Sequence, residues 1–186
     1  MAHATTKEIA KAAGFSEATL YKHFQDKTEL FVAVLAERLP RFVPLIAELT
    51  SNVGERTVVE NLRRVVAAAV VFYTDSFPIS VSIFAEPKVL TAHRAGLRRS
   101  GAGPHKANAA LAEYLAAERE LGRIRPDADP NALAALLLGA CFQHAFLQQF
   151  ADPSALAAPP EEVAETLVDA LAPALVVGPV DGVGAR

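Results

Sequence analysis

The chain has 186 residues, of which 52% are hydrophobic and 21% are charged, so it can bury a core without disulfides or a structural metal. A single cysteine, Cys141, excludes an intramolecular disulfide and indicates a reducing, cytoplasmic setting. The net charge of −3 excludes a chain that is basic overall, although residues 1–27 carry four lysines against three acidic residues.

The fold class predicted from the sequence is all-α, because alanine and leucine dominate and no sustained alternation of apolar and polar residues indicates strands. Clusters of glycine, proline and serine separate the predicted helices, which span residues 6–13, 17–24, 28–49, 55–75, 79–86, 88–99, 105–121, 130–150 and 160–177. Ser16 is predicted to cap the second helix and Asp129 the eighth, where Pro130 takes the first helical position.

Two segments are expected to be irregular. Pro40 and Pro44 interrupt the third predicted helix and predict a kink or break near Leu39. Residues 178–186 contain three glycines and a proline and are expected to form a flexible tail. The most apolar stretch, Ala132–Phe142, is about half of the roughly 20 residues that a membrane helix requires, so no membrane span is expected.

Residues 6–24 have the spacing of a helix-turn-helix. Ala10 is small where two helices would cross, Gly14 allows the turn, and Ser16 starts the second helix. The second helix is then predicted to present outward Glu17, Ala18, Thr19, Tyr21, Lys22 and His23. Short side chains of this kind suit base edges in the major groove, and Tyr, Lys and His suit phosphates.

The run Thr19-Leu20-Tyr21-Lys22-His23-Phe24, followed by Lys27, resembles the DNA-binding region of the TetR family, and the resemblance covers about residues 5–38. It implies that the DNA-binding residues are Thr6, Lys7, Ser16, Glu17, Ala18, Thr19, Tyr21, Lys22, His23 and Lys27, with Glu17, Ala18 and Thr19 toward the bases. It implies core positions for Leu20 and Phe24. Members of the family have one more helix before this run, and Met1–Thr5 is too short to supply it, so the DNA-binding head is expected to lack its usual first helix.

The rest of the chain resembles the family in architecture only. We expect a DNA-binding domain over residues 1–45 and an effector-binding and dimerisation domain over residues 46–177. The helix at 130–150 is apolar almost all round its first half and must be covered on more than one side, while the helix at 160–177 carries a stripe of apolar and small residues. A homodimer through these two helices is predicted, and burial of both stripes within one subunit is the alternative.

The effector site is expected among aromatic and polar side chains of the body helices. The candidates are Phe72, Tyr73, Phe84, His93, Tyr114, Phe142, Gln143 and Phe146. Cys141 and His144 share a helix face, but no further groups complete a nucleophilic or metal site, so no catalytic residue, metal or cofactor is expected.

The function predicted from these features is a DNA-binding transcription regulator rather than an enzyme. Its partners would be double-stranded operator DNA and a small, largely apolar effector that releases a repressor from the operator. The alternative is a helical small-molecule-binding protein without operator activity.

Overall fold

The computed structural model describes residues 10, 14, 16–24, 42–101, 103–151 and 158–175. Their secondary structure is helical, as predicted, and no strand occurs among them. The helices are α2 (Glu17–His23), α4 (Val43–Ser51), α5 (Val58–Ala85), α6 (Pro87–Ser100), α7 (Pro104–Glu120), α8 (Pro130–Gln148) and α9 (Pro160–Leu175).

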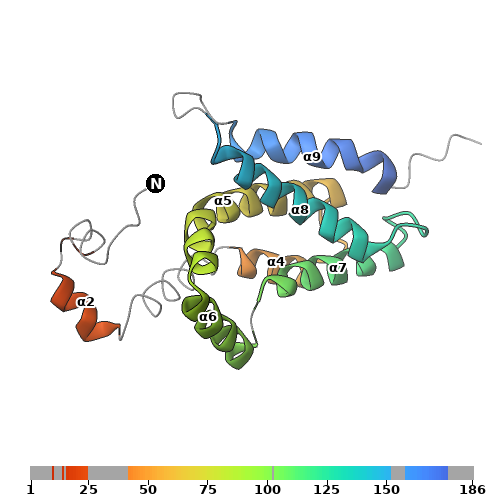
Figure 1. Cartoon of the computed structure of the whole chain (residues 1–186). Helices are drawn as coiled ribbons and strands as arrows, with labels where there is room; N and C mark the ends of the chain where they lie inside the picture. Colours follow the sequence, from red (N-terminus) through yellow and green to blue (C-terminus); the bar gives the residue numbers. More distant parts are fainter. Residues whose placement is uncertain are drawn as a thin grey trace, which may run out of the picture.

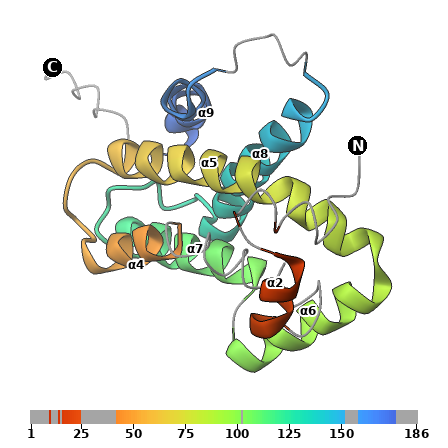
Figure 2. The same ribbon diagram turned by 90° about the vertical axis from the view of Figure 1, so that its left-hand side faces the viewer.

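The long helix α5 is the centre of the body. It packs against α9 and α8, while α7 packs against α8 and α4 (Figure 1). Helix α6 follows α5 after a sharp turn, and α2 lies at the end of the molecule where α5 meets α6 (Figures 1 and 2). The small N-terminal element is thus set apart from a larger helical body.

The core of the body is built from one face of each long helix. Val65, Val66 and Ala69 of α5 meet Leu111 and Leu115 of α7 in a single buried cluster, which also takes in side chains of α4, α8 and α9. Burying each of the larger aliphatic side chains contributes about 1.5–3 kcal/mol. Both α5 and α8 are long and apolar enough to cross a membrane by length and composition, but their buried faces pack on other helices of the chain.

The predicted break at residues 76–78 is wrong, because α5 continues through Pro78. Pro78 is exposed, so its ring projects away from the core, and the lost backbone hydrogen bond affects only one turn. Packing along the rest of α5 outweighs that loss. The start of α5 is fixed by a capping box between Thr57 and Glu60, a Thr-x-x-Glu signal that the sequence contains.

The third predicted helix, residues 28–49, is not helical at Phe42, because α4 begins at Val43. Pro44 falls in the first turn of α4. Backbone N–H groups in the first turn have no acceptor within the helix, so a proline there removes no helical hydrogen bond. The kink predicted near Leu39 lies outside the described residues, as do the predicted tail over 178–186 and most of the first predicted helix.

Candidate DNA interface and effector site

Helix α2 starts as the helix-turn-helix pattern predicts. Gly14 has φ 75°, a left-handed conformation that favours glycine, in the turn that precedes the helix. Ser16 is the N-cap, and its Oγ accepts a hydrogen bond from the backbone N–H of Thr19 at 3.2 Å. Ala10 is buried and helical on the other side of this turn. The predicted cap and turn are therefore confirmed.

The outward face of α2 carries the side chains that the sequence analysis assigned to DNA. Tyr21 is 51% exposed, and Ala18, Lys22 and His23 are also exposed. Lys22 and His23 lie in the last turn of α2, where the helix dipole favours a positive charge. Leu20 and Phe24, expected in the core, are half-buried. The exposed face is therefore polar and partly cationic.

The remaining members of the predicted DNA-binding set are less exposed on α2 or fall outside the described residues. Glu17 and Thr19 are half-buried on α2, and the Thr19 hydroxyl lies 2.8 Å from the hydroxyl of Ser16. Thr6, Lys7 and Lys27 fall outside the described residues.

A continuous row of aromatic rings runs from the core of the body to its surface. This aromatic row consists of Phe42, Phe72, Tyr73, Phe77, Phe142, Phe146 and Phe150. Successive ring centroids lie 5.1–5.9 Å apart, from the Phe146–Phe150 pair to the Phe77–Phe146 pair, within the range of favourable aromatic contacts. The row starts at the buried Phe42 and ends at Phe150, which is 75% exposed.

The aromatic row joins helices that are far apart in the sequence. The edge-to-face contact between Tyr73 of α5 and Phe142 of α8 links the two helices at 5.7 Å. The Tyr73 hydroxyl is a neutral hydrogen-bond donor and acceptor at physiological pH, as tyrosine ordinarily is, and burial raises its pKa further, to about 12. A polar group within an aromatic lining can orient a mainly apolar ligand.

The other predicted effector residues lie outside the row. Tyr114 is fully buried, and its hydroxyl accepts a hydrogen bond from Asn61 Nδ2 at 2.9 Å. Phe84, near the end of α5, is 68% exposed, and Gln143 is exposed on α8. His93 is half-buried on α6, and burial lowers the pKa of its imidazole. The structure thus brings together Phe72, Tyr73, Phe142 and Phe146 of the predicted set.

Tyr114 belongs to a polar network that fixes the loop between α4 and α5. Asn61 Nδ2 also donates to the Glu55 carbonyl at 3.0 Å, and the fully buried Glu118 accepts from the Gly54 N–H at 3.1 Å. The guanidinium of Arg123 lies 3.1 Å from a Glu118 carboxylate oxygen, so the buried charge is paired. These contacts give Tyr114 a structural role.

The two helices predicted to form a dimer use their apolar surfaces differently within the chain. Val163, Leu167 and Leu171 of α9 are half-buried against the core cluster, so the chain covers part of this stripe, while Ala170 and Ala174 stay exposed. Helix α8 buries one face and leaves another apolar face open. This outer face of α8 consists of Leu136, Phe142, Phe146 and Leu147, with Phe150 just beyond the helix end.

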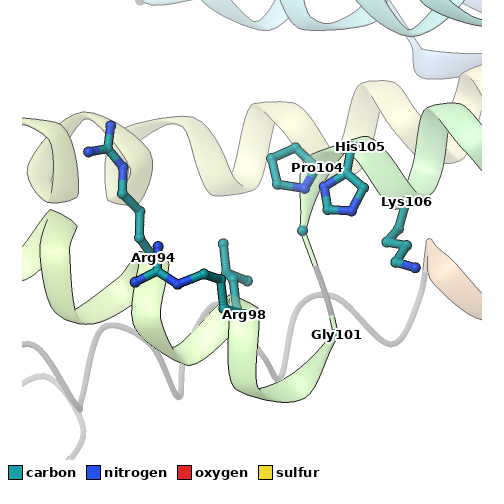
Figure 3. Close-up of a pocket in the computed structure, with 8 residues that line it drawn as sticks. Arg94, Arg98, Gly101, Pro104, His105 and Lys106 are labelled. Atoms are coloured by element: carbon teal, nitrogen blue, oxygen red, sulfur yellow. The ribbon is translucent and has the colours of Figure 1, made fainter.

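A pocket of about 410 Å³ lies where α6 connects to α7. Its basic lining comes from Arg94 and Arg98 of α6 and from Lys106 at the start of α7, and the His105 imidazole lies beside them (Figure 3). Sequence reasoning missed this pocket, although the signal was present. Residues 87–106 hold five lysine and arginine residues and no aspartate or glutamate.

Comparison with known proteins supports the helix-turn-helix. Residues 1–34 match the family model of bacterial regulatory proteins of the tetR family. No curated protein matches the chain.

Solved structures share the fold across most of the chain. A protein of Mesorhizobium loti classed with the TetR-family transcriptional regulators is 22% identical, with a TM-score of 0.66 over 93% of this chain and 87% of that one. SmeT, the repressor of the Stenotrophomonas maltophilia multidrug efflux pump SmeDEF, is 21% identical, with a TM-score of 0.62 over 98% and 84%. The ketosteroid transcriptional regulator of Mycobacterium tuberculosis is 16% identical, with a TM-score of 0.61 over 94% and 85%. The two findings agree: residues 1–34 match the tetR family model, and the chain shares the fold of solved TetR-family regulators.

Proposed function

We propose that the chain is a homodimeric, ligand-responsive repressor that binds operator DNA in the cytoplasm. In this proposal residues 1–45 bind DNA and residues 46–177 bind the effector and the second subunit. The observation that carries the proposal is the exposed face of α2. Tyr21, Lys22 and His23 lie on this face, in the helix that follows the Gly14 turn and the Ser16 cap. Such a helix fits the major groove, with short side chains at the bases and cations at the phosphates.

The proposed operator contact is made by two copies of α2, one from each subunit. A two-fold symmetric dimer matches a palindromic operator, with half-sites about one helical turn apart. The proposed dimer contact is the outer face of α8, because exposed phenylalanine and leucine side chains on one helix face are costly in water. Helix α9 would contribute its small exposed residues Ala170 and Ala174 at the edge of this contact.

The proposed effector is a small, largely apolar molecule that contacts the aromatic row. Phe72, Tyr73, Phe142 and Phe146 offer ring faces and edges, and the neutral Tyr73 hydroxyl offers one polar group. The row involves both α5 and the proposed dimer helix α8. A ligand there would act by binding one arrangement of the subunits more tightly, with a typical coupling of about 1–3 kcal/mol.

The test is the salt dependence of DNA binding by the wild-type chain and by Lys22→Ala. If Lys22 contacts a phosphate, the variant binds all duplexes more weakly, and the slope of log K against log salt falls by about one unit. Fluorescence anisotropy with the promoter DNA of neighbouring genes and with random duplex measures both quantities. Lys88→Ala is the matched control, because Lys88 is an exposed lysine on α6 and should leave the slope unchanged.

Equal slopes for the wild type and Lys22→Ala would contradict the assignment of Lys22. Absence of any duplex binding at low salt would contradict operator activity as a whole. It would favour the alternative of a helical small-molecule-binding protein.

A further inference from the structure

The pocket between α6 and α7 has a lining that the proposed apolar effector does not explain. Arg94, Arg98, His105 and Lys106 line it, and all four are exposed. No acidic residue lies among the described residues of the lining, and no described carboxylate forms an ion pair with Arg94, Arg98 or Lys106. Among the residues that the structure describes, the pocket therefore gathers positive charge without a counter-ion.

The α6 side of the pocket places two arginines where their like charges destabilise the helix. Arg94 and Arg98 are four residues apart, so they lie on the same face of α6, and like charges at this spacing destabilise a helix. Arg98 and Arg99 lie in the last turn, where the helix dipole favours cations. Arg94 lies before that turn, so the dipole does not explain its position.

The α7 side of the pocket is a helix start without the usual negative charge. Gly103 is the N-cap and makes no side-chain cap hydrogen bond, and the first turn contains no acidic residue. Lys106 instead lies at the positive end of the helix dipole, where a cation is unfavourable and an anion is stabilised. At Gly103 a Cβ atom would lie 2.9 Å from the His105 ring, so the glycine lets the ring lie over the backbone at the pocket wall.

We propose that the α6–α7 pocket is a binding site for a small multivalent anion that carries phosphate or carboxylate groups. Guanidinium groups bind both kinds of oxyanion through paired N–H donors, and Lys106 adds a point charge from the neighbouring helix. Its volume of about 410 Å³ is sufficient for a small organic anion. The lining shares no residue with the aromatic row, so this is a second site besides that of the apolar effector.

Isothermal titration calorimetry of the full chain without DNA tests the proposal, with inorganic pyrophosphate and citrate as the two probes. The double variant Arg94→Gln/Arg98→Gln should weaken binding of the preferred probe by about tenfold or more. The matched control is Lys88→Gln/Arg99→Gln, which removes the same charge from the exposed surface of α6 outside the pocket lining. The control should keep the affinity within about twofold.

The outcomes separate the sources of the anion. Binding of pyrophosphate alone identifies a phosphate ligand, binding of citrate alone identifies a carboxylate ligand, and either result with the expected variant pattern supports the site. Equal weakening in both double variants, or binding of neither probe by the wild type, overturns it. Circular dichroism melts check that both variants fold, since all four replaced side chains are exposed.

One further arm tests nucleic acid as the ligand. If Arg94→Gln/Arg98→Gln weakens random duplex binding and leaves both small anions unaffected, the surface contacts DNA and the proposal is overturned. Because the calorimetry contains no DNA, failure of the anion site would leave the operator proposal standing, and the reverse also holds.

Discussion

Cys141 lies at the centre of the body with its thiol out of contact with water. Its Sγ is 3.9 Å from the backbone carbonyl of Val66, and burial raises the pKa of the thiol from 9.0 to about 12. Burial also raises the pKa of Tyr73 from 10.0 to about 12. Both groups stay neutral in the folded chain at pH values where they ionise in the unfolded chain.

These shifts predict a loss of stability at alkaline pH. Above about pH 9 the unfolded state releases the Cys141 proton while the folded state keeps it, so the free energy of unfolding falls as the pH rises. The slope reaches about 1.4 kcal/mol per pH unit for one such group, and Tyr73 adds to it above about pH 10. Below pH 9 the contribution of Cys141 is fully present. Urea unfolding at a series of pH values measures the slope.

Cys141→Ala isolates the thiol in this experiment. It lowers the free energy of unfolding at every pH because it leaves a small cavity, but it should flatten the slope between about pH 9 and pH 10. A slope that is unchanged in this interval would rule out Cys141 as its source.

At the residue scale the sequence predicted features that depend on a few consecutive residues. It did not predict contacts between residues that are far apart in the chain. The Ser16 cap and the Gly14 turn follow from rules that act within a few residues, and both were predicted. Tyr114 was predicted as a polar group that could orient the effector, and this role stays a prediction beside its observed hydrogen bond. Its partner Asn61 lies 53 positions away, which no local pattern indicates.

Among the elements, α5 shows how packing overrides a local stop signal. Ser76-Phe77-Pro78 predicted a break, yet the helix runs from Val58 to Ala85. Two serines in this stretch bond to backbone carbonyls of the same helix, Ser80 Oγ to Ser76 at 3.0 Å and Ser82 Oγ to Pro78 at 3.1 Å. Packing against α8 and α9 before Pro78, and against α6 after it, supports the helix on both sides.

Pro78→Ala is expected to stabilise the chain. Proline costs about 3 kcal/mol relative to alanine inside a helix, and the more flexible unfolded chain of the variant offsets about 1 kcal/mol of that gain. Since Pro78 is exposed, no core contact is lost, and the free energy of unfolding should rise by about 1–2 kcal/mol. Urea unfolding at a fixed chain concentration measures the change.

The control for this substitution is Pro87→Ala. Pro87 is also exposed but occupies the first position of α6, where its missing N–H has no helical partner to lose. Its replacement should change the free energy of unfolding by no more than about 0.5 kcal/mol. Destabilisation by Pro78→Ala would mean that the proline ring is required by contacts in α5.

The aromatic row and the α6–α7 pocket mark the limit of prediction at the level of elements. The aromatic residues were visible in the sequence, but the contact of Tyr73 with Phe142 depends on how α5 crosses α8. The pocket forms because the end of α6 and the start of α7 lie close together across a short connection. Helical periodicity predicts which face of one helix is buried, but not how the ends of two helices are placed.

For the whole molecule, the decisive question is what covers the outer face of α8. The sequence correctly indicated that this helix is apolar almost all round its first half, and the chain covers one of its faces. The predicted stripe of α9 is different, because its larger side chains Val163, Leu167 and Leu171 are half-buried against the core of the same chain. Sequence alone could not separate these cases, since a stripe looks the same whether its partner lies in the same subunit or in another.

Leu136→Glu is expected to dissociate the proposed dimer. Leu136 is 63% exposed in the chain, so glutamate is tolerated in an isolated subunit, whereas a dimer through the outer face of α8 would bury a carboxylate without a partner. Because a two-fold interface contains the substitution twice, the dimer dissociation constant should rise by about 100-fold or more. Light scattering coupled to size-exclusion chromatography gives the mass across a dilution series.

The control is Leu121→Glu, a comparable substitution at a 57% exposed leucine just after α7, which should leave the mass unchanged. A dimer that survives Leu136→Glu would place the subunit contact on another surface, and the open face of α8 would then need a different partner.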